Sequence, residues 1–201
     1  MTMTIASCTP TDGTYLAGLV ARAFADNPVT KWLTLGMEAE PERQRMLEAY
    51  FRILVDYALR DGEVEATSDG SGAALWLPPE APPPADYDER LAEATGHRAE
   101  RFHTLDAAMH RAHPTDTRHH HLALLAVEPR VHSTGYGTAL LEHHHRRLDE
   151  QGLDAYLEAS APRNRALYER MGYQLTGDTF ELPDGPSMWP MRRPAPRAAS
   201  R

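Results

Sequence analysis

The sequence predicts a mixed α/β domain, and two segments of alternating strand and helix character carry that prediction. In the first, an apolar stretch at 122–127 leads through a proline and a Gly-Tyr-Gly turn into a helix. In the second, a strand-like stretch at 153–160 is followed by a short helix that ends at Gly172 and by a further strand at 173–182. This alternation is typical of a sheet covered by helices.

The N-terminal half supplies more elements of both kinds. We expect a strand at 4–7, an amphipathic helix at 11–25, a second helix at 41–60, a hairpin of strands 62–67 and 73–77, and a polar helical segment at 88–113. Breaks at Asp26-Asn27-Pro28 and in the proline-rich 78–84 separate these elements. Such breaks favour loops that contact a substrate.

The loop that follows the apolar strand carries the functional signal. Pro129 ends the strand because it cannot donate to a β-ladder. Ser133 and Thr134 are predicted N-caps of the next helix, and Gly135 and Gly137 permit close backbone approach. The first turn of a helix has unpaired N–H groups and a partial positive charge. The segment therefore predicts a site for a pyrophosphate, with a strand edge beside it.

Other phosphate-binding motifs fit less well. A dinucleotide fold requires a small residue at position 140, which is Leu140, and a glycine directly after the strand, whereas seven residues separate Val127 from Gly135. A Walker loop is excluded because the chain has no Gly-Lys-Ser/Thr. Taken alone, Gly-x-Gly equally fits an ordinary turn between a loop and a helix.

Four blocks of the C-terminal half match a known pattern. They are Val127-x-Pro129, His132-x-x-Gly135-x-Gly137, Tyr156-Leu157-Glu158-x-Ser160 and Asn164-x-x-x-Tyr168-Glu169-Arg170-x-Gly172-Tyr173. Together they resemble the GNAT superfamily of acyl-CoA-dependent N-acyltransferases, and weaker matches at 23–28 and 74–79 extend the resemblance upstream. The runs 160–164 and 182–186 are similar to the puromycin N-acetyltransferase type of actinomycetes in particular.

The resemblance implies the details of the fold. We expect a single GNAT domain over residues 1–193, with a mixed, mostly antiparallel central sheet of about seven strands. Helices would cover both faces, and the sheet would splay between strands 4 and 5. Residues 194–201 are rich in Ala, Pro and Arg, and we expect a disordered tail there.

The resemblance also implies that acetyl-CoA is the cosubstrate. Its pantetheine arm would pair, like an added strand, with Leu125, Ala126 and Val127. Its pyrophosphate would be held by N–H groups of the following loop, namely His132, Ser133, Thr134, Gly135, Tyr136, Gly137 and Thr138. One residue departs from the family, which usually has Gln or Arg where this chain has His132. Cofactor affinity could therefore depend on pH near the ordinary histidine pKa of about 6.5.

Three residues are the candidate catalytic groups. By the resemblance, Asn164 would contact the pantetheine or the attacking amine, and Tyr168 would protonate the departing CoA sulfur. The amine would attack the thioester directly, with no covalent enzyme intermediate. Glu158, which lies mid-strand, is a candidate general base, because a protonated amine must first lose a proton. His119, His121 and bulk water are rival acceptors.

Two histidine runs invite a metal interpretation. Consecutive residues on a strand alternate faces, so residues 119–121 cannot all bind one ion. Residues 143–145 diverge by about 100° each on a helix and are predicted to form a solvated face with one half-buried member. We therefore predict no metal site.

Composition limits the class of protein. The formal net charge of −8 argues against nucleic-acid binding and favours a cationic small molecule. The single Cys8 excludes an intrachain disulfide. No apolar run approaches the about 18 residues that a membrane span needs, and no signal pattern is present, so we expect a cytoplasmic monomer or homodimer.

The sequence therefore predicts an acyltransferase that acetylates a small-molecule primary amine, with an antibiotic or other secondary metabolite as one substrate class and a role in antibiotic resistance. Two alternatives remain open. The chain could be a non-catalytic acyl-CoA or drug-binding protein of the same fold. It could also use this fold for other acyl-thioester chemistry.

Overall fold

The computed structural model describes residues 3–79, 81–82 and 84–196. Their strands are β1 (Ile5–Ser7), β2 (Glu63–Thr67), β3 (Gly72–Leu77), β4 (His119–Val127), β5 (Asp154–Ala159), β6 (Gln174–Leu175), β7 (Phe180–Glu181) and β8 (Ser187–Arg193). Their α-helices are α1 (Gly13–Phe24), α2 (Pro28–Leu33), α3 (Glu40–Asp61), α4 (Tyr87–Thr95), α5 (Ala99–Ala112), α6 (Tyr136–Gln151) and α7 (Pro162–Arg170).

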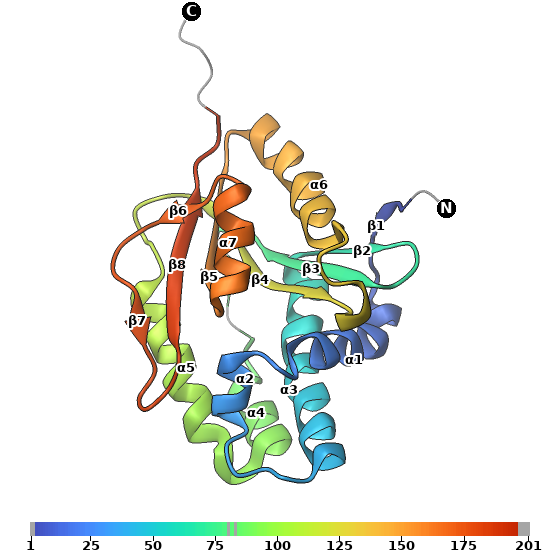
Figure 1. The fold of residues 1–201 in the computed structure, drawn as a ribbon, viewed down its shortest axis with the longest axis vertical. Helices are drawn as coiled ribbons and strands as arrows, with labels where there is room; N and C mark the ends of the chain where they lie inside the picture. The colour runs from blue at the N-terminus through green and yellow to red at the C-terminus, as the bar shows by residue number, and fades with distance from the viewer. Residues whose placement is uncertain (1–2, 80, 83, 197–201) are drawn as a thin grey trace, which may run out of the picture.

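The strands form one sheet in the order β1-β2-β3-β4-β5-β8-β6, and β7 also pairs with β8 (Figure 1). All neighbours are antiparallel except β4 and β5. Those two pair only from His119 opposite Asp154 to His121 opposite Tyr156. Beyond that point the strands diverge, and α6 and α7 flank the opening in Figure 1. The predicted fold class and the splay between strands 4 and 5 are confirmed.

A β-bulge in β4 sets which side chains face the opening. Leu75 lies opposite Leu124, whereas Trp76 lies opposite Leu122, so Ala123 is an extra residue in β4. The alternation of side chains therefore shifts by one position. Leu122 packs in the core beneath α6 and α7, and Leu124 packs in the core on the opposite face.

Two hydrophobic cores sandwich the sheet. One lies between the sheet and the helices of the N-terminal half, chiefly α1, α3 and α5. The other lies beneath α6 and α7. Trp32, Tyr50 and Trp76 are buried in these cores, so core packing accounts for side chains that could also have lined a substrate pocket.

Four elements differ from the sequence prediction. The helical segment at 88–113 is two α-helices, because Gly96 has φ +56° and ends α4. The helix α2 was not predicted, although Asn27 caps its first turn by accepting a hydrogen bond from the Val29 amide. The strand predicted at 173–182 is the two short strands β6 and β7, and β8 was missed.

The chain ends beyond β8. Of the tail predicted to be disordered, residues 197–201 lie outside the described part. Among the described helices, none combines the length and the apolar character that crossing a membrane requires.

Candidate active site

The loop before α6 presents backbone N–H groups in an unusual conformation. Ser133 and Gly135 have φ values of +62° and +96°, and Gly135, rather than Ser133 or Thr134, is the N-cap of α6. The side chains of the two predicted caps are used elsewhere. The Thr134 hydroxyl donates to the Val131 carbonyl at 2.6 Å. The first N–H groups of α6 therefore have no side-chain acceptor from a cap and remain available to an anion.

Two side chains brace this loop. The Nε2 of His132 lies 2.9 Å from the Val127 carbonyl, which can only accept, so Nε2 carries the proton. The other ring nitrogen then accepts from Arg163 at 3.3 Å, and Arg163 also donates to the Ser133 hydroxyl at 3.0 Å. The imidazole thus ties the loop to the end of β4, and a guanidinium lies over the loop. Arg163 was not predicted from the sequence, although it stands in the first turn of α7 beside the matched Asn164.

A cavity of about 370 Å³ adjoins the loop and the splayed strands. Most of the residues predicted to bind the cofactor line it: Leu125, Val127, His132, Ser133, Gly135, Tyr136, Gly137, Thr138, Asn164 and Tyr168. Two predicted residues do not, because Ala126 is buried in the opposite core and the Thr134 hydroxyl turns back to Val131. Further lining comes from the end of α1 and the loop after it, from the segment before α6 and from α7: Ala23, Phe24, Asn27, Val131, Arg163, Leu167 and Arg170.

Tyr168 reaches the cavity from α7. Its side chain packs in the core beneath α7, with its ring centroid 5.7 Å from that of Tyr173. Burial raises the pKa of the Tyr168 phenol above its ordinary value. The hydroxyl therefore keeps its proton at neutral pH and could give it to a more basic group.

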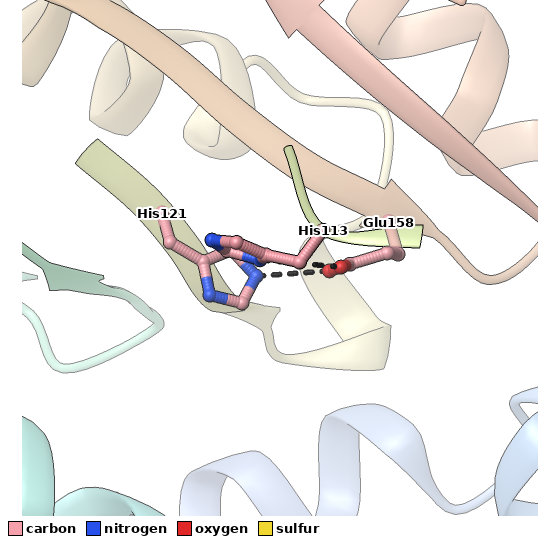
Figure 2. A group of neighbouring side chains, drawn as sticks. All are labelled: His113, His121 and Glu158. Atoms are coloured by element: carbon pink, nitrogen blue, oxygen red, sulfur yellow. Dashed lines mark hydrogen bonds and ion pairs between the residues drawn. The ribbon is translucent and has the colours of Figure 1, made fainter. Parts of the chain in front are cut away.

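Glu158 lies outside the set of residues that line the cavity. Its side chain is 2% exposed, and its Oε2 lies 2.9 Å from Nε2 of His121. Burial by itself raises the pKa of the Glu158 carboxyl, but His121 and His113 outweigh this effect and lower that pKa to about 2. A carboxylate is therefore held beside an imidazole (Figure 2). It lies on the face of the sheet opposite Tyr168, because its strand neighbours Leu157 and Ala159 pack in the same core as Tyr168.

Comparison with known proteins gives a consistent result. Residues 107–194 match the acetyltransferase (GNAT) domain family. The match covers 88 of the 201 residues of the chain. The predicted acyltransferase class is thereby confirmed. A structure of histone acetyltransferase HPA2 and related acetyltransferase from Corynebacterium glutamicum is 26% identical, covers 100% of both chains and has a TM-score of 0.68.

More distant structures share the GNAT fold. Polyamine N-acetyltransferase of Drosophila melanogaster, which forms N-acetylagmatine, is 17% identical, covers 96% of this chain and 100% of its own, and has a TM-score of 0.65. PaiA N-acetyltransferase of Thermoplasma acidophilum, solved in complex with coenzyme A, is 12% identical over 96% and 99% of the two chains, with a TM-score of 0.56.

The histidines of α6 depart from one prediction. His144 and His145 are both buried, and only His143 is half-exposed, so α6 does not present the run to solvent. His144 stacks on Trp76 at a centroid distance of 4.1 Å, and Nε2 of His145 lies 2.9 Å from the Tyr173 hydroxyl. The burial depends on Trp76 in β3 and on Tyr173 just before β6, and neither partner can be identified from the histidine run alone.

Proposed function

We propose that the chain transfers the acetyl group of acetyl-CoA to the nitrogen of a small primary amine. The observation that carries the proposal is the junction at the splay. There, the free edge of β4, the N–H groups before α6 and the protonated Tyr168 all border one cavity. A pantetheine arm needs a strand edge, a pyrophosphate needs N–H donors, and a departing thiolate needs an acid.

The cavity chemistry fits acetyl-CoA as substrate. A Cβ built on Gly135 would meet nothing within 4 Å, so space is open above the loop. Arg163 adds a positive charge at the same place, where it could contact a phosphate bidentately. Asn164 lines the wall between this loop and Tyr168, in reach of either the arm or the amine.

The proton of the amine requires an acceptor. We propose that His121 accepts it, because its Nε2–H donates to the Glu158 carboxylate, which is ionised at neutral pH and stabilises the imidazolium that forms. Their position on the opposite face from Tyr168 suits a reaction in which the amine and the thioester meet within the splay. A reaction without a covalent enzyme intermediate is also consistent with the state of Cys8. Burial raises the pKa of its thiol to about 11, so the thiol stays protonated and is a poor nucleophile.

Three observations favour a cationic amine as acceptor. The chain has a net charge of −8, the Glu158 carboxylate is ionised, and the Drosophila neighbour forms N-acetylagmatine. Antibiotic amines, including puromycin-like aminonucleosides, are the finer proposal that the sequence resemblance supports.

The test measures thiol release from acetyl-CoA with a panel of agmatine, polyamines, arylalkylamines and aminonucleosides, together with CoA binding by calorimetry. We expect CoA to bind and at least one amine to yield an N-acetyl product by mass spectrometry. Absence of CoA binding would contradict the proposal. Tight binding with no turnover would favour the non-catalytic alternative.

A further inference from the structure

Two groups of histidine and carboxylate side chains lie outside the cavity. Among the described residues, the ligand-capable atoms of Glu63, Glu65 and His144 lie within 4.8 Å of one another, and so do those of His113, His121 and Glu158. The first group already has its cation, because Arg147 donates to both carboxylates, at 2.7 Å to Oε1 of Glu65. A metal ion would have to displace that guanidinium. The second group consists of two imidazoles and one carboxylate.

Three separate elements bring the second group together. His121 on β4 and Glu158 on β5 share a face, because the parallel register places His121 opposite Tyr156, two residues before Glu158. His113 caps the C-terminus of α5, which ends over the same face. Figure 2 shows the two imidazoles and the carboxylate turned toward one another. His113 lies outside the histidine runs 119–121 and 143–145, so no pattern in the sequence indicates that it lies beside His121.

Hydrogen bonds fix the proton positions on two of the rings. The Thr117 carbonyl can only accept, so Nδ1 of His119, 2.8 Å away, must carry a proton. In a neutral ring Nε2 of His119 is then an acceptor, and the Nε2 of His113 at 3.0 Å must be the donor. When the His113 ring is neutral, its Nδ1 therefore has a lone pair, and Nδ1 lies 3.9 Å from Oε1 of Glu158.

This arrangement leaves two acceptors facing each other across a gap. Within the part of the chain that the structure describes, Oε1 of Glu158 is buried and has no hydrogen-bond partner. A buried acceptor without a partner is costly, and a cation bound between Oε1 of Glu158 and Nδ1 of His113 would satisfy both atoms. We propose that His113 Nδ1, His121 Nε2 and the Glu158 carboxylate bind a divalent transition metal ion of the Zn²⁺ class, and that the proton which His121 Nε2 donates to Glu158 moves to Nδ1 of the same ring when the ion binds.

The donor set suits such an ion. Two imidazoles and one carboxylate bind Zn²⁺ or Fe²⁺ in proteins, with bonds of about 2.0–2.2 Å and one or more positions left open. The ligand atoms of the three residues lie within 4.8 Å of one another, whereas ligands at the corners of a tetrahedron of that radius are about 3.3 Å apart. A small rotation of the side chains would therefore have to bring the atoms closer together. The His113 side chain is 33% exposed at a helix end, which gives it freedom to rotate and gives the ion access from solvent. His119 supplies the outer hydrogen bond that orients a ligating imidazole.

Occupation would affect turnover. The ion would take the imidazole and the carboxylate that the proposed function assigns to the amine proton, so bound metal should inhibit acetyl transfer. This inhibition rests on the proposed function, whereas the binding itself does not.

Binding can be tested without any activity assay. Untagged, chelator-treated protein is titrated with Zn²⁺ against a chromophoric chelator, and with Co²⁺ while its visible absorption bands are recorded. We expect one equivalent to bind. His113→Gln and Glu158→Gln should weaken binding by more than the about 10–100-fold that loss of an outer-shell partner causes. His143→Gln is the matched control, because its side chain is equally exposed, at 32%, and lies beside the other carboxylate group.

The outcomes separate the two proposals. Binding that is lost in His113→Gln and kept in His143→Gln supports the site, even if Glu158→Gln does not fold. Failure to bind one equivalent, or loss of binding only in His143→Gln, overturns it. If Zn²⁺ binds at the three residues but leaves the rate of acetyl transfer unchanged, the site stands and the proton-accepting role of His121 and Glu158 fails.

Discussion

Replacing Gly135 by alanine perturbs the phosphate loop through its backbone alone. The residue has φ +96°, yet a Cβ placed there would meet no atom within 4 Å, so alanine introduces strain and no steric clash. A left-handed conformation costs an L-residue about 1–2 kcal/mol. We expect the free energy of unfolding to fall by that amount. We expect the loop to relax in part to relieve the strain, which turns its N–H groups and raises the Kd for CoA by up to about 5–30-fold, the equivalent of the same energy.

Gly152 provides a matched control at the other end of the same helix. It has φ +67°, and its Cβ would likewise meet no atom within 4 Å. Gly152→Ala should therefore lose similar stability while the Kd for CoA stays within about twofold. Unfolding in urea gives the stability of both variants, and calorimetry gives both affinities. An unchanged Kd in Gly135→Ala, or an equal rise in Gly152→Ala, would refute the assignment of the loop as the pyrophosphate site.

Three further variants probe the acid, the guanidinium and a buried histidine. Tyr168→Phe should lower kcat by about 10²–10³ with little change in the Kd for CoA, since the thiolate is a tolerable leaving group without its acid; Tyr173→Phe, which does not reach the cavity, should change kcat by less than about threefold in the same thiol-release assay. Arg163→Ala should raise the Kd for CoA by about tenfold or more and reduce its salt dependence, because a charged hydrogen bond contributes about 1.5–3 kcal/mol; an equal effect from Arg165→Ala, whose guanidinium instead donates to Glu169 and lies over the Trp189 ring, would argue against a specific contact. Burial and nearby Arg193 lower the pKa of His145 from about 6.5 to about 3, so the unfolded chain binds a proton that the folded chain does not, and stability falls as pH drops from about 6.5 toward 3. His145→Gln should make this slope shallower by up to about 1.4 kcal/mol per pH unit in urea unfolding followed between pH 6 and 4, and parallel curves for the two proteins would show that His145 does not contribute.

The residues proposed to bind acetyl-CoA, the acetyl donor, could be predicted because they are close together in the sequence. Gly135 and Gly137 stand between a strand and a helix, and Asn164 and Tyr168 are one helical turn apart. Local order of this kind survives folding, and the cavity indeed has these residues in its wall. Arg163 was missed because a single arginine in a first helical turn carries no signal until the loop that it contacts is known.

The residues proposed to take the proton of the acceptor amine are brought together by tertiary structure, which the sequence does not display. Glu158 meets His121 only through the parallel register of β4 and β5, and His113 arrives from the end of a helix. The bulge at Ala123 reverses the alternation within β4, so odd-numbered residues before and after it face opposite ways. No local pattern marks that bulge.

The missed strand has a similar explanation. β8 lies between β5 and β6, and Pro190 in its middle cannot donate a hydrogen bond. Proline at such a position argues against a central strand. It is accommodated because its carbonyl still accepts from the Thr176 amide at 3.0 Å.

A crystal structure of the chain with acetyl-CoA tests the central claim most directly. We predict that the diphosphate oxygens lie within hydrogen-bond distance of amides between Ser133 and Thr138, that the pantetheine follows the edge of β4, and that the sulfur lies near the Tyr168 hydroxyl. A nucleotide bound at any other surface, with this loop left vacant, would contradict the account.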